Sequence, residues 1–133
     1  MKRASLSFQQ IGWMTMSSEA PEQWEIWHAR FNFSEGKGYK FRPVIVLRVQ
    51  DDGSLVTMVT SATNKLSLAH DYPIEDWKQA GLQKPSIARL DRIAEIPRDY
   101  LGTAGRIGRL SDRDVSEITI IVNEVLSERR RDG

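Results

Sequence analysis

The chain has 133 residues, no cysteine and a net charge of +1, with 19 Lys and Arg against 18 Asp and Glu. This length predicts one domain with a single core. The lack of cysteine excludes disulfides and thiolate metal sites. The two histidines are too few for most zinc sites. The balanced charge does not predict nucleic-acid binding by itself, so any phosphate site must be local.

The start of the chain predicts an N-terminal extension over residues 1–22, followed by one domain over residues 23–133. The first 15 residues lack the apolar centre of a secretory signal, and the sequence holds no run of about 18 apolar residues. We therefore expect a cytoplasmic protein that does not contact a membrane. In "WEIWHARFNF" the apolar Trp27, Ala29 and Phe31 alternate with polar residues, which predicts a half-buried strand.

The next segments predict a run of further strands. "SEGKGYK" is typical of a loop, and the β-branched "PVIVLRV" (43–49) predicts a central strand that is covered on both faces. "DDG" predicts a hairpin turn that leads into the strand "LVTMVTSA". We then expect a weak strand at 69–74, one helical turn closed by Gly81, a strand at 86–97 and a short strand within 102–110.

The last segment, "SDRDVSEITIIVNEVLSERRR", predicts an amphipathic helix over residues 111–131. Ser111 is the expected N-cap, with Asp114 three residues later. Apolar residues recur at helical spacing from Val115 to Val125. Several short strands and one C-terminal helix predict a mainly β fold with some α structure, a small barrel or rolled sheet capped by the helix.

Arg42 stands directly before Pro43 and the most apolar run of the chain. A residue before proline is restricted to extended conformations, and the proline itself belongs at a strand start or edge. The Arg42 guanidinium is then held at the rim of the sheet, where its fork of donors suits a phosphate. A solvated arginine at a strand end is the simpler interpretation.

Hydroxyl side chains end the strand that follows the hairpin. Thr60 and Ser61 can donate hydrogen bonds to a phosphate or to a ribose hydroxyl, or they can satisfy local backbone groups. Arg89 and Asp91 are two apart in a predicted strand, so alternation puts them on one face about 7 Å apart. They are candidates for charge stabiliser and proton acceptor, or for an ordinary surface ion pair.

These segments, in this order, resemble the MazF/PemK/Kid toxins of bacterial toxin–antitoxin systems. The matching blocks are "EIW", a glycine-containing loop, "RPVIVL", "VTS" after a hairpin and "SIARLD" before the last helix, and the resemblance covers residues 24–128. It implies an SH3-like barrel with a C-terminal helix, a homodimer, and cleavage of single-stranded RNA without metal or other cofactor. It also implies a cognate antitoxin protein as partner.

The resemblance places the family's catalytic arginine on Arg42 and its hydroxyl residue on Thr60. It places the arginine–aspartate pair of the PemK branch on Arg89 and Asp91. In this mechanism Arg42 and Arg89 hold the phosphate, Thr60 supports it, and Asp91 is the candidate base for the 2′-hydroxyl. The expected substrate-binding residues are Ser61, Lys40 and Lys65, with Lys37 and Arg92 as further basic side chains along the approach.

Two features leave alternatives open. The loop "SEGKGYKF" departs from the family's usual loop, which normally shapes the RNA channel. The same barrel also carries non-catalytic toxins such as the gyrase poison CcdB, and a family member can act as a binding module alone. The Arg-Pro pair and the hydroxyl residue favour the nuclease over a CcdB-like poison, and the binding module stays open.

Overall fold

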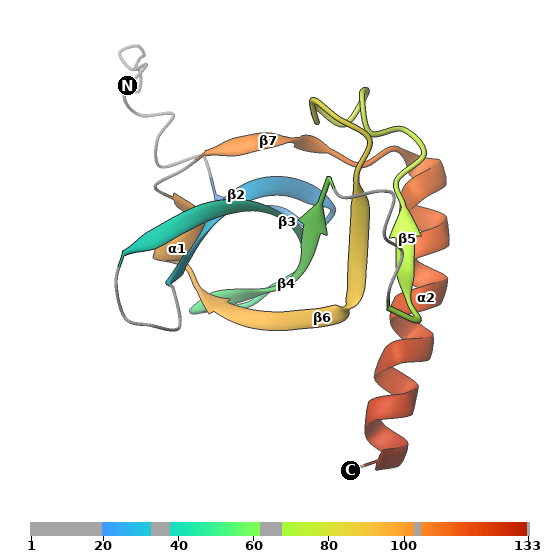
Figure 1. Cartoon of the computed structure of the whole chain (residues 1–133). Helices are drawn as coiled ribbons and strands as arrows, with labels where there is room; N and C mark the ends of the chain where they lie inside the picture. The colour runs from blue at the N-terminus through green and yellow to red at the C-terminus, as the bar shows by residue number, and fades with distance from the viewer. Residues whose placement is uncertain (1–19, 33–37, 62–67, 103–104, 133) are drawn as a thin grey trace, which may run out of the picture.

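The computed structural model describes residues 20–32, 38–61, 68–102 and 105–132, which fold into one curled antiparallel sheet and two helices (Figure 1). The strand order is β5-β6-β4-β3-β2-β7, so β5 and β7 are the two edges and the sheet is open rather than a closed barrel. This confirms the mainly β fold with a C-terminal helix. The elements are β2 (Glu25–Asn32), β3 (Tyr39–Val49), β4 (Gly53–Thr60), β5 (Asp71–Pro73), β6 (Ile87–Pro97), α1 (Asp99–Gly102), β7 (Arg106–Arg109) and α2 (Asp112–Asp132).

Strand β3 begins earlier than the sequence predicted. It starts at Tyr39 rather than at Pro43, because β2 pairs with it along this whole stretch, with Ala29 opposite Arg42 and His28 opposite Pro43. On the other side, β4 pairs with β3 only from Val44 onward. Pro43 therefore has one neighbouring strand, a position at which a missing N–H is tolerated.

The apolar run of β3 is buried on both faces, as predicted. Val44 and Val46 pack into one cluster with Trp27, and Ile45 and Leu47 pack into a second cluster on the other face. All four side chains are at most 5% exposed. The sheet therefore has a core on each side, and the hydrophobic effect of both cores fixes the register of its central strand.

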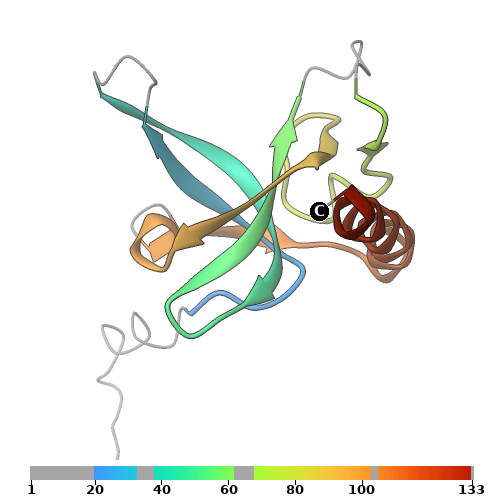
Figure 2. The ribbon, with the colours of Figure 1, turned by 90° about the horizontal axis from the view of Figure 1, so that it is seen from below.

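Helix α2 covers the second of these clusters and stands beside β5, while α1 lies on the other side of the sheet (Figures 1 and 2). Ile118 and Val125 are buried against the sheet, as the helical spacing predicted. The N-terminal end of α2 is capped as expected, with the Ser111 hydroxyl accepting a hydrogen bond from the Asp114 backbone N–H at 3.3 Å.

The Asp114 carboxylate also binds residues that are far away in the sequence. It is fully buried and accepts hydrogen bonds from the Tyr72 hydroxyl at 2.6 Å, the Glu75 N–H at 3.0 Å and the Asp76 N–H at 2.9 Å. Burial and the hydrogen bond to this carboxylate raise the pKa of Tyr72. One side chain thus joins the first turn of α2 to the segment that follows β5.

Two local expectations have different outcomes, and one helix was not expected from the sequence. Residues 75–81, expected as one helical turn, form successive hydrogen-bonded turns that end at Gly81, whose φ is 97°. Helix α1 was not predicted, because four residues are too few to show a periodicity. Residues 1–19 lie outside the described part of the chain, so the N-terminal extension stays a prediction.

Glycine is required where the turn at residues 80–81 crosses β7. A Cβ atom built on Gly108 would lie 1.9 Å from the backbone oxygen of Ala80, and one on Gly81 would lie 2.6 Å from the backbone oxygen of Ile107. No side chain fits at either distance, so these glycines allow the two backbones to touch.

Glu25 is a buried carboxylate at the start of β2, only 4% exposed. It accepts hydrogen bonds from the Trp27 indole, the Arg106 guanidinium and the Glu22 backbone N–H, each at 2.9 Å. Burial alone would raise the pKa of Glu25, but these bonds outweigh it and hold the pKa below the usual 4.5. The charged form of Glu25 therefore stabilises the fold.

This arrangement predicts a specific acid sensitivity. Because the folded-state pKa is lowered, the stabilisation is present above about pH 4.5 and is lost as the pH falls through the folded-state pKa. Glu25→Gln should cost about 1–3 kcal/mol at neutral pH and should flatten the acid side of the stability profile. Urea unfolding as a function of pH measures both effects. Glu22→Gln, an exposed neighbour, is the matched control, and an unchanged acid profile in Glu25→Gln would contradict the assignment.

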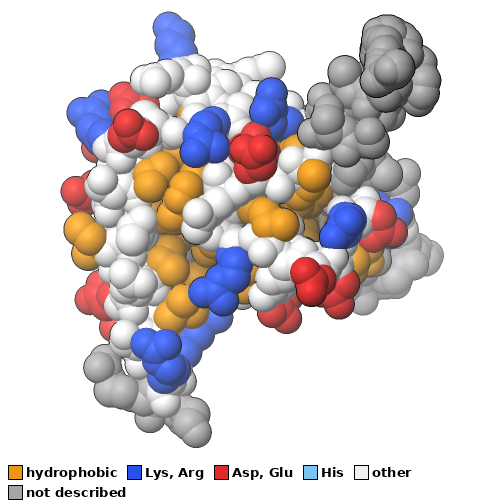
Figure 3. Space-filling view, turned by 180° about the vertical axis from the view of Figure 1, so that it is seen from behind, with side chains coloured by type: hydrophobic (Ala, Val, Ile, Leu, Met, Phe, Trp, Pro, Cys, Tyr) orange, Lys and Arg blue, Asp and Glu red, His pale blue; other side chains and the backbone are white. Residues whose placement is uncertain are grey.

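The surface carries charges of both signs. Figure 3 shows Lys and Arg interspersed with Asp and Glu, around hydrophobic side chains that reach the surface. Among the described residues, the exposed large hydrophobic side chains are Phe41, Val49 and Ile120. None of the described helices is both long enough and apolar enough to cross a membrane.

Candidate functional site

Three neighbouring strands bring basic side chains together in one cleft of about 250 Å³. Strand β3 contributes Arg42, the end of β4 contributes Met58, Val59 and Thr60, and β6 contributes Arg89 and Arg92. Three of the four predicted catalytic residues, which are spread over nearly 50 positions of the sequence, therefore line a single cleft. Their meeting follows from the strand order, in which β4 lies between β3 and β6.

The arginines of the cleft differ in how they are held. The Arg89 side chain is 19% exposed and forms an ion pair with Asp71 of β5 at 3.2 Å, and the Asp71 side chain is 1% exposed. Arg42 and Arg92 are exposed. One guanidinium is thus fixed by a buried carboxylate, while the other two arginines that line the cleft are exposed.

Asp91 is not among the described residues that line the cleft. Arg89 is opposite Met58 and Ile93 is opposite Thr57, so residues 90–92 form an irregularity that breaks the alternation of β6. The Asp91 carboxylate accepts hydrogen bonds from the His70 backbone N–H at 2.8 Å and lies 2.7 Å from its ring Nδ1. The Asp91 side chain is thus bound to His70, whereas Arg92 lines the cleft.

The bonds to Asp91 also affect its acidity. Burial alone would raise the pKa of the Asp91 carboxyl, but the hydrogen bonds from the side chain and backbone of His70 outweigh it, and the pKa falls below its usual value. No carboxylate or imidazole is found among the described residues that line the cleft. Its chemistry is therefore that of fixed positive charge plus one hydroxyl group.

Of the predicted substrate-binding residues, the structure describes Ser61 and Lys40, and neither is among the residues that line the cleft. Ser61 is exposed and lines a second cavity of about 270 Å³, together with His28, Pro43 and the segment around Gly81. Successive residues of a strand point to opposite faces, which accounts for the separation of Pro43 from Arg42 in β3. Lys40 is exposed on β3 two residues before Arg42. Lys65 and Lys37 lie outside the described residues.

Two residues of this region were missed by sequence reasoning. Asp71 holds Arg89, and His70 holds Asp91. Both belong to the segment "AHDYPI", which was expected only as a weak strand. No local pattern reveals them, because their partners are about 20 positions away and are reached only through the pairing of β5 with β6.

The chain is similar to known proteins both in sequence and in fold. The family model for PemK-like, MazF-like toxins of type II toxin–antitoxin systems matches residues 22–126. A comparison of the sequence with curated proteins found no match.

Several solved structures share the fold. An endoribonuclease from Mycobacterial species, solved in complex with its cognate antitoxin, is 12% identical with a TM-score of 0.60, over 81% of this chain and 94% of that chain. The Mycobacterium tuberculosis toxin MazF-mt6 is 21% identical with a TM-score of 0.60, over 77% and 96%. MazE–MazF from Deinococcus radiodurans is 14% identical with a TM-score of 0.60, over 80% and 95%.

Proposed function

Because the chain belongs to the family of PemK-like, MazF-like toxins of type II toxin–antitoxin systems, we propose that it is an endoribonuclease that cleaves single-stranded RNA without a metal ion. The structural relative from Mycobacterial species is an endoribonuclease. The observation that carries the proposal is the cleft that Arg42, Arg89 and Arg92 line together with Thr60. Three guanidinium groups around one hydroxyl form a site for the phosphate group of a nucleic-acid backbone.

The reaction uses the nucleophile that RNA itself carries. The 2′-oxygen bonds to the adjacent phosphorus while the bond from phosphorus to the 5′-oxygen breaks, which leaves a cyclic phosphate and a 5′-hydroxyl. DNA lacks the 2′-hydroxyl and is not cleaved in this way. A regular duplex hinders the in-line geometry, so the substrate is single-stranded.

The arginines act on the charge that develops at the phosphate. In our proposal Arg42 and Arg92 bind non-bridging oxygens, Arg89 clamps the phosphate from the position that Asp71 fixes, and Thr60 donates a supporting hydrogen bond. An arginine does not release its proton near neutral pH. Catalysis in the cleft is therefore positioning and electrostatic stabilisation, with the proton of the 2′-hydroxyl passing to water and the leaving 5′-oxygen taking one from water.

Asp91 as the general base stays a prediction, and the geometry does not favour it, because its carboxylate is bound to His70. We instead expect Asp91 to position the segment that carries His70 and Asp71. Ser61, Lys40 and Lys65 remain proposed contacts to RNA on either side of the scissile phosphate.

We further propose an antitoxin as the natural inhibitor and a homodimer as the active form, acting in the cytoplasm. The mycobacterial relative was solved with its cognate antitoxin. A partly disordered acidic segment of such a partner can fold into a basic cleft and exclude RNA from it.

A cleavage assay tests the proposed function directly. The purified chain, incubated with a single-stranded RNA and EDTA, should yield fragments that end in a cyclic phosphate and begin with a 5′-hydroxyl. The matched control is the same oligonucleotide with one 2′-deoxy nucleotide at the cut position, which should resist cleavage there. Cleavage that stops with EDTA, or that proceeds at the deoxy position, would contradict the mechanism. Intact RNA together with arrest of gyrase would instead identify a CcdB-like poison.

A further inference from the structure

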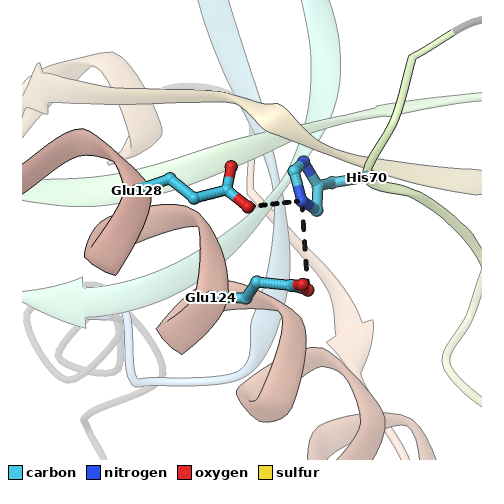
Figure 4. Close-up of side chains that lie close together, drawn as sticks. All are labelled: His70, Glu124 and Glu128. Carbon is cyan, nitrogen blue, oxygen red and sulfur yellow. Dashed lines mark ion pairs between the residues drawn. The ribbon is translucent and has the colours of Figure 1, made fainter. Parts of the chain in front are cut away.

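A second group of charged side chains lies between α2 and the loop before β5 (Figure 4). Glu124 and Glu128 project from successive turns of α2 toward the ring of His70. The Nε2 atom of His70 lies 3.9 Å from Glu124 and 3.7 Å from Glu128. One nitrogen and two carboxylate oxygens, all within 4.8 Å of one another, therefore face a common point.

We propose that His70, Glu124 and Glu128 bind a divalent transition-metal ion, with Zn²⁺ as the first candidate. The proposal does not depend on the proposed RNA cleavage, because none of these residues lines the cleft.

The distances from Nε2 of His70 to the two glutamates fit metal ligands around a common ion better than they fit hydrogen bonds. A hydrogen bond requires about 2.7–3.2 Å between heavy atoms, and both separations from Nε2 exceed this. Ligands bound tetrahedrally at about 2.0–2.1 Å from zinc lie about 3.3–3.4 Å apart. A shift of about half an ångström brings each glutamate oxygen to that spacing from Nε2, and the two oxygens, which lie within 4.8 Å of each other, must approach one another by up to about 1.4 Å.

Asp91 prepares the histidine for this role. An ionised carboxylate can only accept hydrogen bonds, so the Nδ1 atom of His70, at 2.7 Å, carries the proton. When Nε2 carries no proton, its lone pair faces the two glutamates. A carboxylate that receives the other N–H of a ligating histidine is the usual support of a metal ligand. The Asp91 carboxylate also accepts a hydrogen bond from the backbone N–H of His70.

The charges of the cluster favour a cation. Like charges one helical turn apart, as at Glu124 and Glu128, destabilise a helix. Asp91 adds a third carboxylate, and the guanidinium of Arg129 donates to the backbone oxygen of Asp91 at 3.4 Å. An ion at this point relieves the repulsion. A mixed nitrogen and oxygen donor set suits Zn²⁺ better than Mg²⁺ or Ca²⁺, which prefer oxygen alone.

Accessibility is consistent with a site that fills from solvent. The side chains of Glu124 and Glu128 are 59% and 44% exposed, whereas that of His70 is 15% exposed. Three protein ligands leave the remaining positions to water. An ion held there would tie the C-terminal half of α2 to the sheet, since His70 precedes β5.

Calorimetric titration of the untagged, metal-free chain with Zn²⁺ tests the proposal. At about pH 8, above the usual titration range of histidine, we expect one saturable site and a higher melting temperature. The variant with both Glu124→Gln and Glu128→Gln should lose this site, and Asp91→Asn should weaken it about 10- to 100-fold. Glu117→Gln, two turns earlier on the same helix, is the matched control and should bind as the unaltered chain does.

A second readout separates binding at this point from binding elsewhere. Co²⁺ in place of Zn²⁺ should give a visible absorption band typical of tetrahedral coordination, and His70→Asn should abolish that band. An absence of saturable binding would overturn the proposal. Unchanged affinity in the double glutamine variant, with its circular-dichroism spectrum intact, would overturn it as well.

Discussion

Arg42→Ala is expected to reduce RNA cleavage by at least about 100- to 1,000-fold, the cost of removing one well-placed donor from a charge-stabilising site. Arg42 is exposed in the cleft, and no other described side chain there lies on β3. Because its removal leaves no buried cavity, the circular-dichroism spectrum and the stability should stay unchanged. Steady-state cleavage of a fluorogenic RNA measures the effect.

The matched control for this variant is Arg48→Ala. Arg48 is an exposed arginine of the same strand and lies outside the cleft, so this variant removes the same charge from the chain. It should cleave at the rate of the unaltered protein, which excludes a mere effect of net charge. Arg42→Lys should recover only part of the activity, since an ammonium lacks the planar fork of donors. Full cleavage by Arg42→Ala would remove this arginine from the mechanism.

The largest effect on stability is expected at Asp114. Asp114→Ala removes the common acceptor of the Tyr72 hydroxyl and of two backbone N–H groups, and it leaves buried donors without a partner. We expect a loss of about 3–4 kcal/mol, measured as a lower urea midpoint with an unchanged slope.

Two further variants separate the contributions at this point. Asp112→Ala, an exposed acidic residue in the same first turn of α2, should cost less than about 1 kcal/mol and serves as the control. Tyr72→Phe removes only the hydroxyl bond and should cost about 1 kcal/mol. If Asp114→Ala proved as mild as the control, the long-range bonds of this carboxylate would contribute nothing measurable.

The sequence predicted those parts of the fold that depend on local pattern. The β-branched run of β3 indicated a strand buried on both faces, and the spacing of Ile118 and Val125 indicated the buried face of α2. Ser111 and Asp114 were recognised as a helix cap. The bonds from Asp114 to the segment after β5 were not, because nothing local to position 114 specifies what packs against it.

In the candidate site, too, some positions were predicted from the sequence and others depend on contacts between distant residues. Arg42, Thr60 and Arg89 meet in the cleft, although their meeting was inferred from a family resemblance rather than from spacing. Asp91 is bound to His70 and is not among the residues that line the cleft; a prediction by alternation requires a regular strand, and β6 has extra residues at this position. Arg92 entered the cleft for the same reason, whereas the sequence had placed it only along the approach.

The position of β7 in the sheet has a consequence for folding during synthesis on the ribosome. Glu25 pairs with Arg109, so the edge of the sheet beside β2 is formed by residues that leave the ribosome more than 80 positions later. α2, which covers the second core, follows later still. The strands that hold Arg42, Thr60 and Arg89 are therefore synthesised before the elements that stabilise them, and contacts between distant residues form slowly. During synthesis, a partner that binds the incomplete sheet would meet this chain before its fold is finished.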